Sequence, residues 1–221
     1  MDIPSLQAES LRAVLFDVDG TLIDSNYLHV DSFMRAFDDA GAPVPAWRVH
    51  RAIGLDSSRL LEELVGDRAE EVGDAVKEGH SRLYRELWPR LRRFEGAREL
   101  LTALHDRGVH VVLATSAPSD ELEELQRVLD CDDVIFATTN ADDVETAKPE
   151  PDIHGVALER AGVSASEALM VGDARWDQIA AARAGIRSIG VRSGGVSEEE
   201  LLEAGAVEVH DDVAALLRTL S

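Results

Sequence analysis

The order of apolar and polar positions along the chain predicts strands that alternate with helices. Short apolar runs end in polar or turn-forming residues, as buried strands do. These runs are Ala13–Phe16, Val109–Ala114, Val134–Ala137, Ala168–Val171, Arg187–Val191 and Ala206–Val209. Apolar residues at helical spacing or helix-boundary residues predict the helices Ala97–Arg107, Ser119–Leu129, Asp152–Ala161 and Ala174–Ala184. Such alternation is typical of βαβ units, so the sequence predicts an α/β fold with a parallel sheet flanked by helices.

Residues 26–93 interrupt this alternation directly after the first strand. They contain the helical patterns HVDSFMRAFDDAG and SSRLLEELVG and a charged stretch, and no convincing strand. We therefore expect a small all-helical domain, 26–93, inserted into a core domain made of residues 1–25 and 94–221. Asp24-Ser25 and residues 94–96 are the expected hinges.

Composition limits the partners of the chain. Lys and Arg total 22 and Asp and Glu total 43, which gives a formal charge of −21. Such a surface repels phosphate backbones, so nucleic acid and anionic membranes are not expected as main partners. A small anionic substrate would need a local positive site, such as a metal ion or a placed lysine. A monomer is the simplest expectation, with a weak homo-oligomer as the alternative.

The location is predicted from what the sequence lacks. The start, MDIPSLQAESLRAV, has no basic region followed by an apolar stretch, so it does not read as a signal peptide. No apolar run approaches the ~18 residues of a membrane helix. Cys131 is the single cysteine, which excludes an intrachain disulfide and a cysteine metal cluster. We expect a cytoplasmic protein.

Polar residues that carry chemistry follow the predicted strands. They are Asp17 and Asp19, Thr115 and Ser116, Gly172 and Asp173 with Asp177 one helical turn further, and Lys148 after a loop. In parallel α/β sheets the ligand crevice lies at the carboxyl ends of the strands. If these strands are neighbours, the acids, the hydroxyls and the ammonium group converge on one edge of the sheet.

The residue types at this edge suit phosphoryl chemistry. Asp17, Asp19 and Asp173 are hard oxygen donors, and Mg²⁺ prefers a few carboxylates together with water and phosphate oxygens. Lys148 would place a positive charge opposite the phosphoryl oxygens and offset the cost of clustered acids. A carboxylate can accept a phosphoryl group. A second carboxylate two residues further along can act as general acid and then as base.

Each motif also has an ordinary local interpretation. An isolated Asp-x-Asp-Gly is usually a turn, in which Gly20 lets the backbone turn tightly. Thr115, which offers a hydroxyl to a phosphoryl oxygen, and Ser116 also fit a helix N-cap. Gly172-Asp173 fits an N-cap too, and Lys148 fits a solvated loop. All four motifs follow strands, which favours a common site.

Together these residues resemble the haloacid dehalogenase superfamily, in the phosphatase branch with a helical C1-type cap, the group of phosphoglycolate phosphatases and beta-phosphoglucomutases. The motifs that carry the resemblance are Asp17-Val18-Asp19-Gly20-Thr21, Thr115-Ser116, Lys148-Pro149 and Gly172-Asp173-Ala174-Arg175-Trp176-Asp177. The resemblance covers nearly the whole chain. It implies a Rossmann-like core with a small all-helical cap domain inserted after the first strand.

The resemblance also implies roles for individual residues. Asp17 would be the nucleophile, Asp19 the general acid/base, and Lys148 would neutralise charge around Asp17 and the phosphoryl group. The Mg²⁺ cofactor would be held by Asp17, Asp19, Asp173 and Asp177, with Asp19 using its backbone carbonyl and Asp177 acting in support. The substrate-binding residues would be Thr115, Ser116, Lys148 and Gly20.

The resemblance therefore implies a Mg²⁺-dependent phosphatase that hydrolyses a small phosphorylated metabolite through an aspartyl-phosphate on Asp17. Dehalogenase members lack the second acid, which is present here as Asp19. A sugar phosphomutase is the alternative, although the stretch Ala52–Ser58 lacks the Lys that mutases carry, and other cap cations stand at His50, Arg51 and Arg59. A phospho-acceptor domain or a non-catalytic binding module is a further alternative. The sequence does not specify the substrate.

Overall fold

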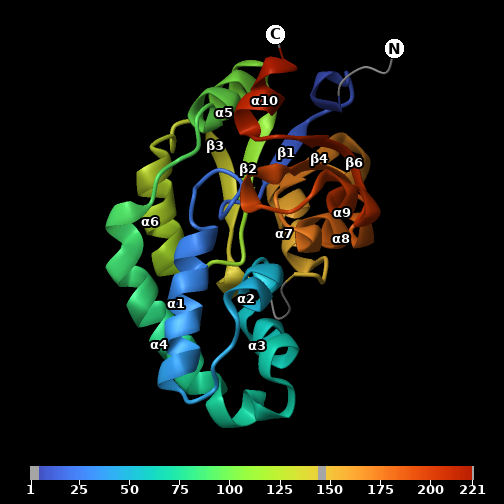
Figure 1. Cartoon of the computed structure of the whole chain (residues 1–221). Coiled ribbons are helices and arrows are strands. Elements are labelled where there is room, and N and C mark those ends of the chain that lie inside the picture. Colours follow the sequence, from blue (N-terminus) through green and yellow to red (C-terminus); the bar gives the residue numbers. More distant parts are fainter. Residues whose placement is uncertain (1–4, 144–147, 221) are drawn as a thin grey trace. The chain divides into compact units, whose positions relative to one another are not determined.

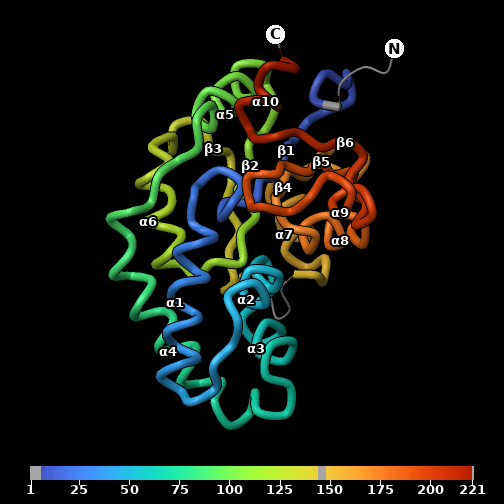
Figure 2. Tube along the Cα trace, viewed as in Figure 1, coloured from blue at the N-terminus to red at the C-terminus, as the bar shows by residue number. Residues whose placement is uncertain are grey.

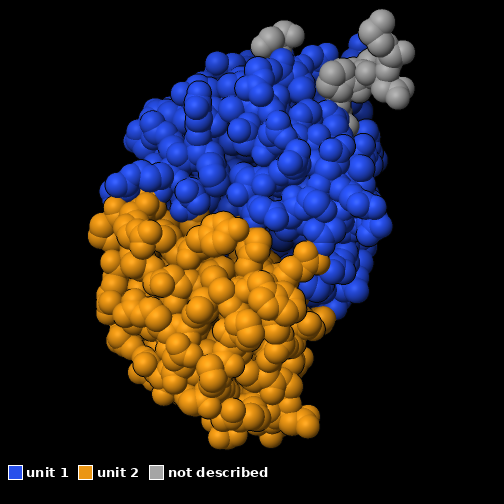
Figure 3. Space-filling view, viewed as in Figure 1, with its two compact units in different colours: residues 1–24, 92–221 blue, residues 25–91 orange. Residues whose placement is uncertain are grey.

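The computed structural model describes residues 5–143 and 148–220. Residues 1–4 of the N-terminal stretch and residues 144–147 just before Lys148 lie outside this description. The chain divides into two compact units, which Figure 3 shows in different colours. Unit 1 comprises residues 1–24 and 92–221, and unit 2 comprises residues 25–91.

Unit 1 contains a six-stranded sheet in which every strand pair is parallel (Figure 1). The strands are β1 (Ala13–Phe16), β2 (His110–Ala114), β3 (Ile135–Thr139), β4 (Ala168–Gly172), β5 (Arg187–Val191) and β6 (Ala206–His210). Their order across the sheet is β3-β2-β1-β4-β5-β6. All six predicted strands are present, and the predicted α/β, Rossmann-like class is confirmed.

Six α-helices accompany this sheet among the described residues of unit 1. They are α5 (Ala97–Asp106), α6 (Ser119–Leu129), α7 (Asp152–Ala161), α8 (Arg175–Arg183), α9 (Glu198–Glu203) and α10 (Val213–Arg218). The four helices predicted from the sequence are confirmed within one residue at each end. Helices α9 and α10 escaped prediction because six residues are too few for a clear helical period.

Alternation of side chains along the strands divides the core of unit 1 into two faces. Ala13 and Leu15 of β1 belong to one apolar cluster with Ala157 of α7 and Ala181 of α8. These small helix residues let α7 and α8 approach the sheet closely. Helices α5, α6 and α10 lie on the other side of the sheet (Figure 1). Strand β1 is therefore buried on both faces, and the residues that follow it begin at the end of a fully buried strand.

Unit 2 is helical throughout and contains no strand. Its helices are α1 (Asn26–Asp39), α2 (Ala46–Ala52), α3 (Ser57–Val65) and α4 (Ala69–Leu87). Helices α1 and α4 pack through stacked rings, with Phe33 over His80 at 3.7 Å and His29 over Tyr84 at 3.9 Å between centroids. The side chain of Asp56 caps α3. Across the described residues, no helix is both long and apolar enough to cross a membrane.

The chain leaves unit 1 just before α1 and returns to it after α4, as the trace in Figure 2 shows, and hydrogen bonds join the two connecting segments. Ile23 and Arg93 form an antiparallel bridge. The Asp24 N–H donates to the Arg92 carbonyl at 2.8 Å, and the Phe94 N–H donates to the Leu22 carbonyl at 2.9 Å. The inserted segment therefore begins and ends at one place on unit 1.

Candidate active site

The candidate site begins where the three central strands end. Asp17 directly follows β1, Thr115 follows β2, and Asp173 follows β4, and these strands are neighbours. The Asp17 N–H donates to the Val171 carbonyl at 3.0 Å, and the Thr115 N–H donates to the Thr139 carbonyl at 3.3 Å. The sheet ladder thus extends one residue beyond β1 and fixes the direction of the Asp17 side chain.

Lys148 is the cation of this edge. Its side chain is 2% exposed, and its Nζ lies 2.5 Å from Oδ1 of Asp17 and 2.7 Å from Oδ1 of Asp177. A solvated loop lysine, the local alternative for this position, is therefore wrong. The ammonium group pairs two carboxylates that are themselves buried, which offsets the cost of removing all three charges from water.

Asp173 joins the cluster through Thr21. The Thr21 hydroxyl lies 2.9 Å from Oδ1 of Asp173 and 3.3 Å from Oδ2 of Asp17. A single hydroxyl proton donates to one acceptor at a time, and the shorter distance favours Asp173. The side chain of Thr21 is fully buried, and its hydroxyl holds Asp173 next to Asp17.

Asp177 lies in the first turn of α8 and has two different partners. Its Oδ2 accepts from the Ala174 N–H at 3.0 Å, while its Oδ1 faces Lys148. Ala174 is therefore the N-cap of α8, and the alternative of Asp173 as N-cap is wrong. A Cβ added to Gly172 would lie 2.5 Å from the Asp177 carboxylate, so only glycine leaves room for this arrangement.

Asp19 and Gly20 lie in a tight loop after Asp17. The Val18 carbonyl accepts from the N–H groups of Leu22 and Ile23 at 2.9 and 3.0 Å. Gly20 has φ 75°, a left-handed conformation that suits glycine. The side chain of Asp19 is partly exposed, and its charge is close enough to contribute to the raised pKa of Asp17.

Thr115 and Ser116 form the turn after β2. The Thr115 side chain is 1% exposed, and its Oγ1 accepts from the Ala117 N–H at 3.0 Å, which leaves its proton available to donate. The Ser116 hydroxyl is buried and has no hydrogen-bond partner among the described residues. Helix α6 takes Pro118 as its N-cap, without a side-chain cap, so the predicted local alternative of a Thr115-Ser116 cap is wrong.

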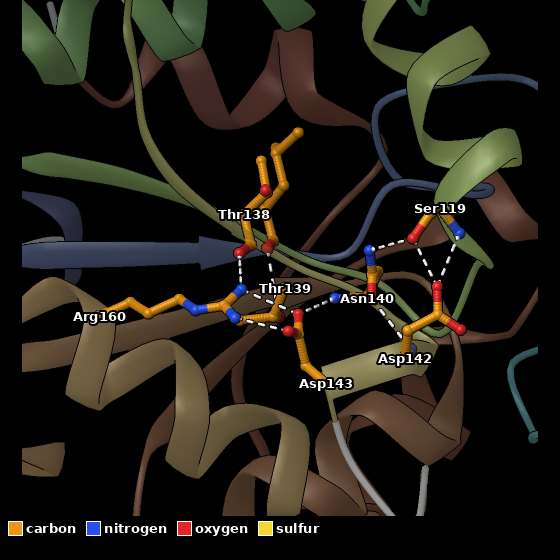
Figure 4. Close-up of polar contacts among 8 residues, drawn as sticks. Ser119, Thr138, Thr139, Asn140, Asp142, Asp143 and Arg160 are labelled. Carbon is orange, nitrogen blue, oxygen red and sulfur yellow. Dashed lines mark hydrogen bonds and ion pairs between the residues drawn. The ribbon is translucent and has the colours of Figure 1, made fainter.

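Ser119 at the start of α6 contacts Asn140 and Asp142, which follow β3 (Figure 4). Helix η4 (Ala141–Asp143) follows β3, and its Ala141 N–H donates to the Ala117 carbonyl at 3.0 Å. The Ser119 hydroxyl donates to Asp142 at 2.5 Å and accepts from the Asn140 amide at 3.0 Å.

Arg160 of α7 completes this network from the other side. It donates two hydrogen bonds to Asp143, at 2.8 and 2.5 Å, and also contacts the Thr138 carbonyl. The Asn140 N–H donates to the same Asp143 carboxylate at 3.0 Å. The start of the loop before Lys148 is thereby fixed to both α6 and α7.

The electrostatics of the cluster are dominated by burial and by carboxylates. Burial raises the pKa of Asp17 well above its usual value, Lys148 opposes this, and Asp177, Asp173 and Asp19 add to it. Burial alone would lower the pKa of Lys148, but the charges of Asp17 and Asp177 and the hydrogen bonds to them outweigh it, and the pKa rises. Lys148 is therefore held as an ammonium ion.

The acids of the cluster fit a divalent cation. Asp17, Asp173 and Asp177 each offer a carboxylate oxygen, and these oxygens all lie within 4.8 Å of one another. The three carboxylates outnumber the one ammonium group, which contacts only Asp17 and Asp177, so an excess of negative charge remains in a buried place. Hard oxygen donors with excess negative charge are the set that divalent metal ions bind in proteins.

The structure brings four of the predicted site residues into one connected cluster, namely Asp17, Lys148, Asp173 and Asp177. Thr115, Ser116, Asp19 and Gly20 lie in the turns that follow β2 and β1 at the same edge. Sequence reasoning missed the role of Thr21, although it stands in the first motif. It also missed Gln178, which donates to the Gly172 carbonyl at 3.0 Å, and Ser193, which donates to the Gly20 carbonyl at 2.6 Å.

Known proteins share both this sequence and this fold. A phosphorylated carbohydrates phosphatase of Thermotoga maritima is 32% identical over 203 residues, which cover 89% of this chain and 93% of that protein. A phosphoglycolate phosphatase of Rhodospirillum rubrum is 31% identical over 215 residues, which cover 93% and 89%. The crystal structure of a hydrolase from Pseudomonas syringae superposes with a TM-score of 0.89 at 33% identity and covers 95% of this chain and 97% of that one.

A family model described as haloacid dehalogenase-like hydrolase matches residues 14–191. The match begins in β1, ends with β5, and so takes in every strand end from which the acidic cluster is built. The predicted resemblance is confirmed by this match and by the similar proteins. On this basis the chain belongs to the family of haloacid dehalogenase-like hydrolases.

Proposed function

We propose that the protein is a magnesium-dependent phosphatase that hydrolyses a small phosphorylated metabolite through an aspartyl-phosphate on Asp17. The observation that carries the proposal is the contact of the Lys148 ammonium with Asp17 at the end of β1. This contact holds one oxygen of Asp17, so that the other oxygen can attack a phosphorus atom. The same ammonium group lies beside Asp17, where it can neutralise charge on the oxygens of the phosphoryl group.

In the first step, a carboxylate oxygen of Asp17 attacks the phosphorus of the monoester. The bond between phosphorus and the ester oxygen breaks, and the alcohol leaves with a proton from Asp19. The hydroxyls of Thr115 and Ser116 and the Lys148 ammonium stabilise the phosphoryl oxygens. The unpartnered, buried hydroxyl of Ser116 supports this role, since a phosphoryl oxygen would supply the partner it lacks among the described residues.

In the second step, water attacks the phosphorus of the aspartyl-phosphate. Asp19, now ionised, accepts a proton from that water, and the bond between phosphorus and Asp17 breaks to release phosphate. Asp17 returns as a carboxylate. The presence of Asp19 two residues after the nucleophile favours this hydrolysis over dehalogenation.

The proposed metal ligands are Asp17, the backbone carbonyl of Asp19 and Asp173, with Asp177 acting in support through Lys148. Phosphatases of this family generally use a divalent metal, and magnesium is our proposal for it. A bound Mg²⁺ would neutralise charge on the transferring phosphoryl group. Thr21 orients Asp173 for this role by donating to one of its oxygens.

Unit 2 is proposed as the cap that excludes water during the first step and selects the leaving group. The proposed substrates are small phosphorylated metabolites. Phosphorylated carbohydrates and phosphoglycolate are the first to test, because two relatives are named as phosphatases of these compounds. The cytoplasmic location and the monomeric or weakly oligomeric state remain predictions from the sequence.

The proposal is tested by measuring phosphate release from a panel of phosphorylated metabolites and a generic aryl phosphate. We expect turnover with Mg²⁺ and none after chelation, and we expect Asp17→Asn to abolish turnover while the protein stays folded by circular dichroism. Wild-type-like hydrolysis by Asp17→Asn would exclude Asp17 as the nucleophile. Isomerisation of a sugar monophosphate without phosphate release would support the mutase alternative instead.

A further inference from the structure

Ser193 reaches the loop of the proposed general acid from a distant part of the chain. It lies in the short helix η6 (Arg192–Gly194), which follows β5. Its hydroxyl donates to the Gly20 carbonyl at 2.6 Å, across a separation of 173 residues. This is a short hydrogen bond between a partly buried side chain and the backbone next to Asp19.

The bond completes the fixation of Gly20. The Gly20 N–H donates to the Ile23 carbonyl at 2.8 Å, and this N–H belongs to the peptide that joins Asp19 to Gly20. The Gly20 carbonyl belongs to the next peptide, and Ser193 holds it. With both peptides fixed, the backbone angles of Gly20 are fixed as well. Without these hydrogen bonds, glycine could adopt several other conformations besides the observed φ of 75°.

Local contacts hold the backbone on either side of Ser193. The turn around it closes with the Gly195 N–H donating to the Arg192 carbonyl at 2.9 Å, and Gly195 takes a left-handed φ of 86°. The guanidinium of Arg192 pairs with Asp211 at 2.9 Å. The hydroxyl of Ser193 therefore stands at a place set by β5 and its turn.

We infer that Ser193 is a positioning residue that orients Asp19 as the general acid through the Gly20 carbonyl. This inference rests on the proposed function, since it assigns Asp19 the proton that leaves with the alcohol. Asp19 is partly exposed and lies in a loop, so the orientation of its carboxyl group depends on the conformation of the adjacent backbone. A bond to the Gly20 carbonyl sets that backbone without touching the substrate.

The inference predicts an effect that depends on the leaving group. An aliphatic alcohol needs a proton as it departs, whereas an aryl alcohol such as p-nitrophenol departs as a stable anion. Misalignment of Asp19 therefore slows transfer from an alkyl phosphate and spares transfer from an aryl phosphate. The quantity to compare is kcat/KM, because it covers the steps up to departure of the alcohol and not the later attack by water.

The experiment measures kcat/KM of the full-length protein with Mg²⁺ on p-nitrophenyl phosphate and on the best alkyl phosphate of the metabolite panel. We expect Ser193→Ala to lower the alkyl value by about tenfold, since general acid catalysis is worth more than that when fully lost. We expect the aryl value to stay within about threefold. Ser193→Thr keeps the hydroxyl and should restore the alkyl value.

Ser197→Ala is the matched control. Ser197 follows the same turn, but its hydroxyl caps α9 and pairs with Glu200. We expect this variant to leave the ratio of the two kcat/KM values unchanged. An equal loss on both substrates in Ser193→Ala, or no loss on either, would overturn the inference.

The inference and the proposed function fail in different ways. Wild-type protein that hydrolyses neither substrate refutes the proposed function and the role of Ser193 with it. Wild-type protein that hydrolyses both, with an unchanged substrate ratio in Ser193→Ala, refutes the role of Ser193 alone. Should Ser193→Ala fold poorly in thermal melts, Ser193→Cys, which keeps the size and weakens the donor, gives the same comparison.

Discussion

Lys148 lies 2.7 Å from Asp177, a residue in the first turn of α8, as well as 2.5 Å from Asp17 at the end of β1. The ammonium group is thus shared by a carboxylate of the sheet edge and a carboxylate of a helix. Asp177 uses its other oxygen to accept from the Ala174 N–H. Asp177 therefore acts on the site chiefly by placing Lys148, and Lys148 keeps the buried acids from repelling one another.

The first prediction concerns the removal of this ammonium group. Lys148→Met should destabilise the fold by ~3–5 kcal/mol in urea unfolding with a chelator present, because it leaves buried carboxylates unpaired. It should also abolish phosphate release. Added Mg²⁺ should recover part of the lost stability, since a cation can replace part of the missing charge. Lys77→Met, at a partly exposed lysine that contacts Ser58 in unit 2, is the control and should change stability by less than about 0.5 kcal/mol.

The second prediction concerns the close approach of Gly172 to Asp177. Gly172→Ala would place a methyl group 2.5 Å from the Asp177 carboxylate, so the Asp177 side chain must leave the position in which it contacts Lys148. We expect a loss of about 1–3 kcal/mol in stability and a clear fall in kcat/KM. Gly155→Ala in α7 is the control, because an added Cβ there meets nothing within 4 Å. It should be neutral or stabilising by up to about 1 kcal/mol. Similar behaviour of the two variants would contradict the predicted clash.

Much of the fold was accessible from the sequence because the strands of the sheet are short apolar runs followed by turn residues. The bounds of β1 and β5 match the prediction, and the apolar run of β1 has a charged residue on either side, Arg12 and Asp17. The bounds of β3 shifted by one residue at its start and by two at its end, because Thr138 and Thr139 are polar yet still pair with β2. A strand end made of polar residues cannot be predicted from a run of apolar residues.

The candidate site was only partly accessible for a related reason. Asp17 and Asp173 were visible because each directly follows a strand, and Asp19 and Asp177 follow them at short spacing in the same motifs. The bonds that orient them join residues far apart in sequence, such as Thr21 with Asp173 and Ser193 with Gly20, across 152 and 173 positions. These contacts depend on the order of the strands in the sheet, which places β4 beside β1 and β5 next to β4. The local pattern of apolar and polar residues does not specify the order of the strands.

The third prediction concerns the network that precedes Lys148 (Figure 4). Arg160→Met removes the two hydrogen bonds to Asp143 and the contact with the Thr138 carbonyl. Both partners are partly exposed, so we expect a loss of stability of only about 1 kcal/mol. Phosphate release should fall more than stability does, because Asp143, five positions before Lys148, loses its attachment to α7. A fall in stability with unchanged kcat/KM would show that this attachment does not serve the site.

Arg127→Met is the matched control for that variant. Arg127 also makes two hydrogen bonds to one carboxylate, that of Glu124, at 2.7 and 2.5 Å. Both residues of the pair lie within α6, three positions apart. We expect stability within about 0.5 kcal/mol of the wild type and unchanged kcat/KM. The comparison therefore separates the loss of an exposed ion pair from the loss of a loop attachment.

The last prediction concerns His154, a fully buried histidine in α7 whose two ring nitrogens have no hydrogen-bond partner among the described residues. Burial, together with the nearby Lys148 ammonium, lowers the pKa of His154 to about 3. The unfolded chain takes up a proton below the ordinary value of about 6.5, whereas the folded protein does not. The neutral imidazole of His154 therefore makes its full contribution to the free energy of unfolding above about pH 6.5. That contribution is lost as the pH falls toward 3.

His154→Phe removes this titration and keeps a ring in the same place. Between about pH 7 and pH 5 the wild type should lose about 2 kcal/mol more stability than the variant, as measured by urea unfolding. At about pH 7 the variant should be as stable as the wild type or more so, because a buried polar group without a partner is replaced by an apolar one. His105→Phe, at an exposed position on α5, should keep the pH dependence of the wild type. Parallel stability curves for the wild type and His154→Phe would show that the folded protein takes up the proton as readily as the unfolded chain, contrary to the burial of His154 beside Lys148.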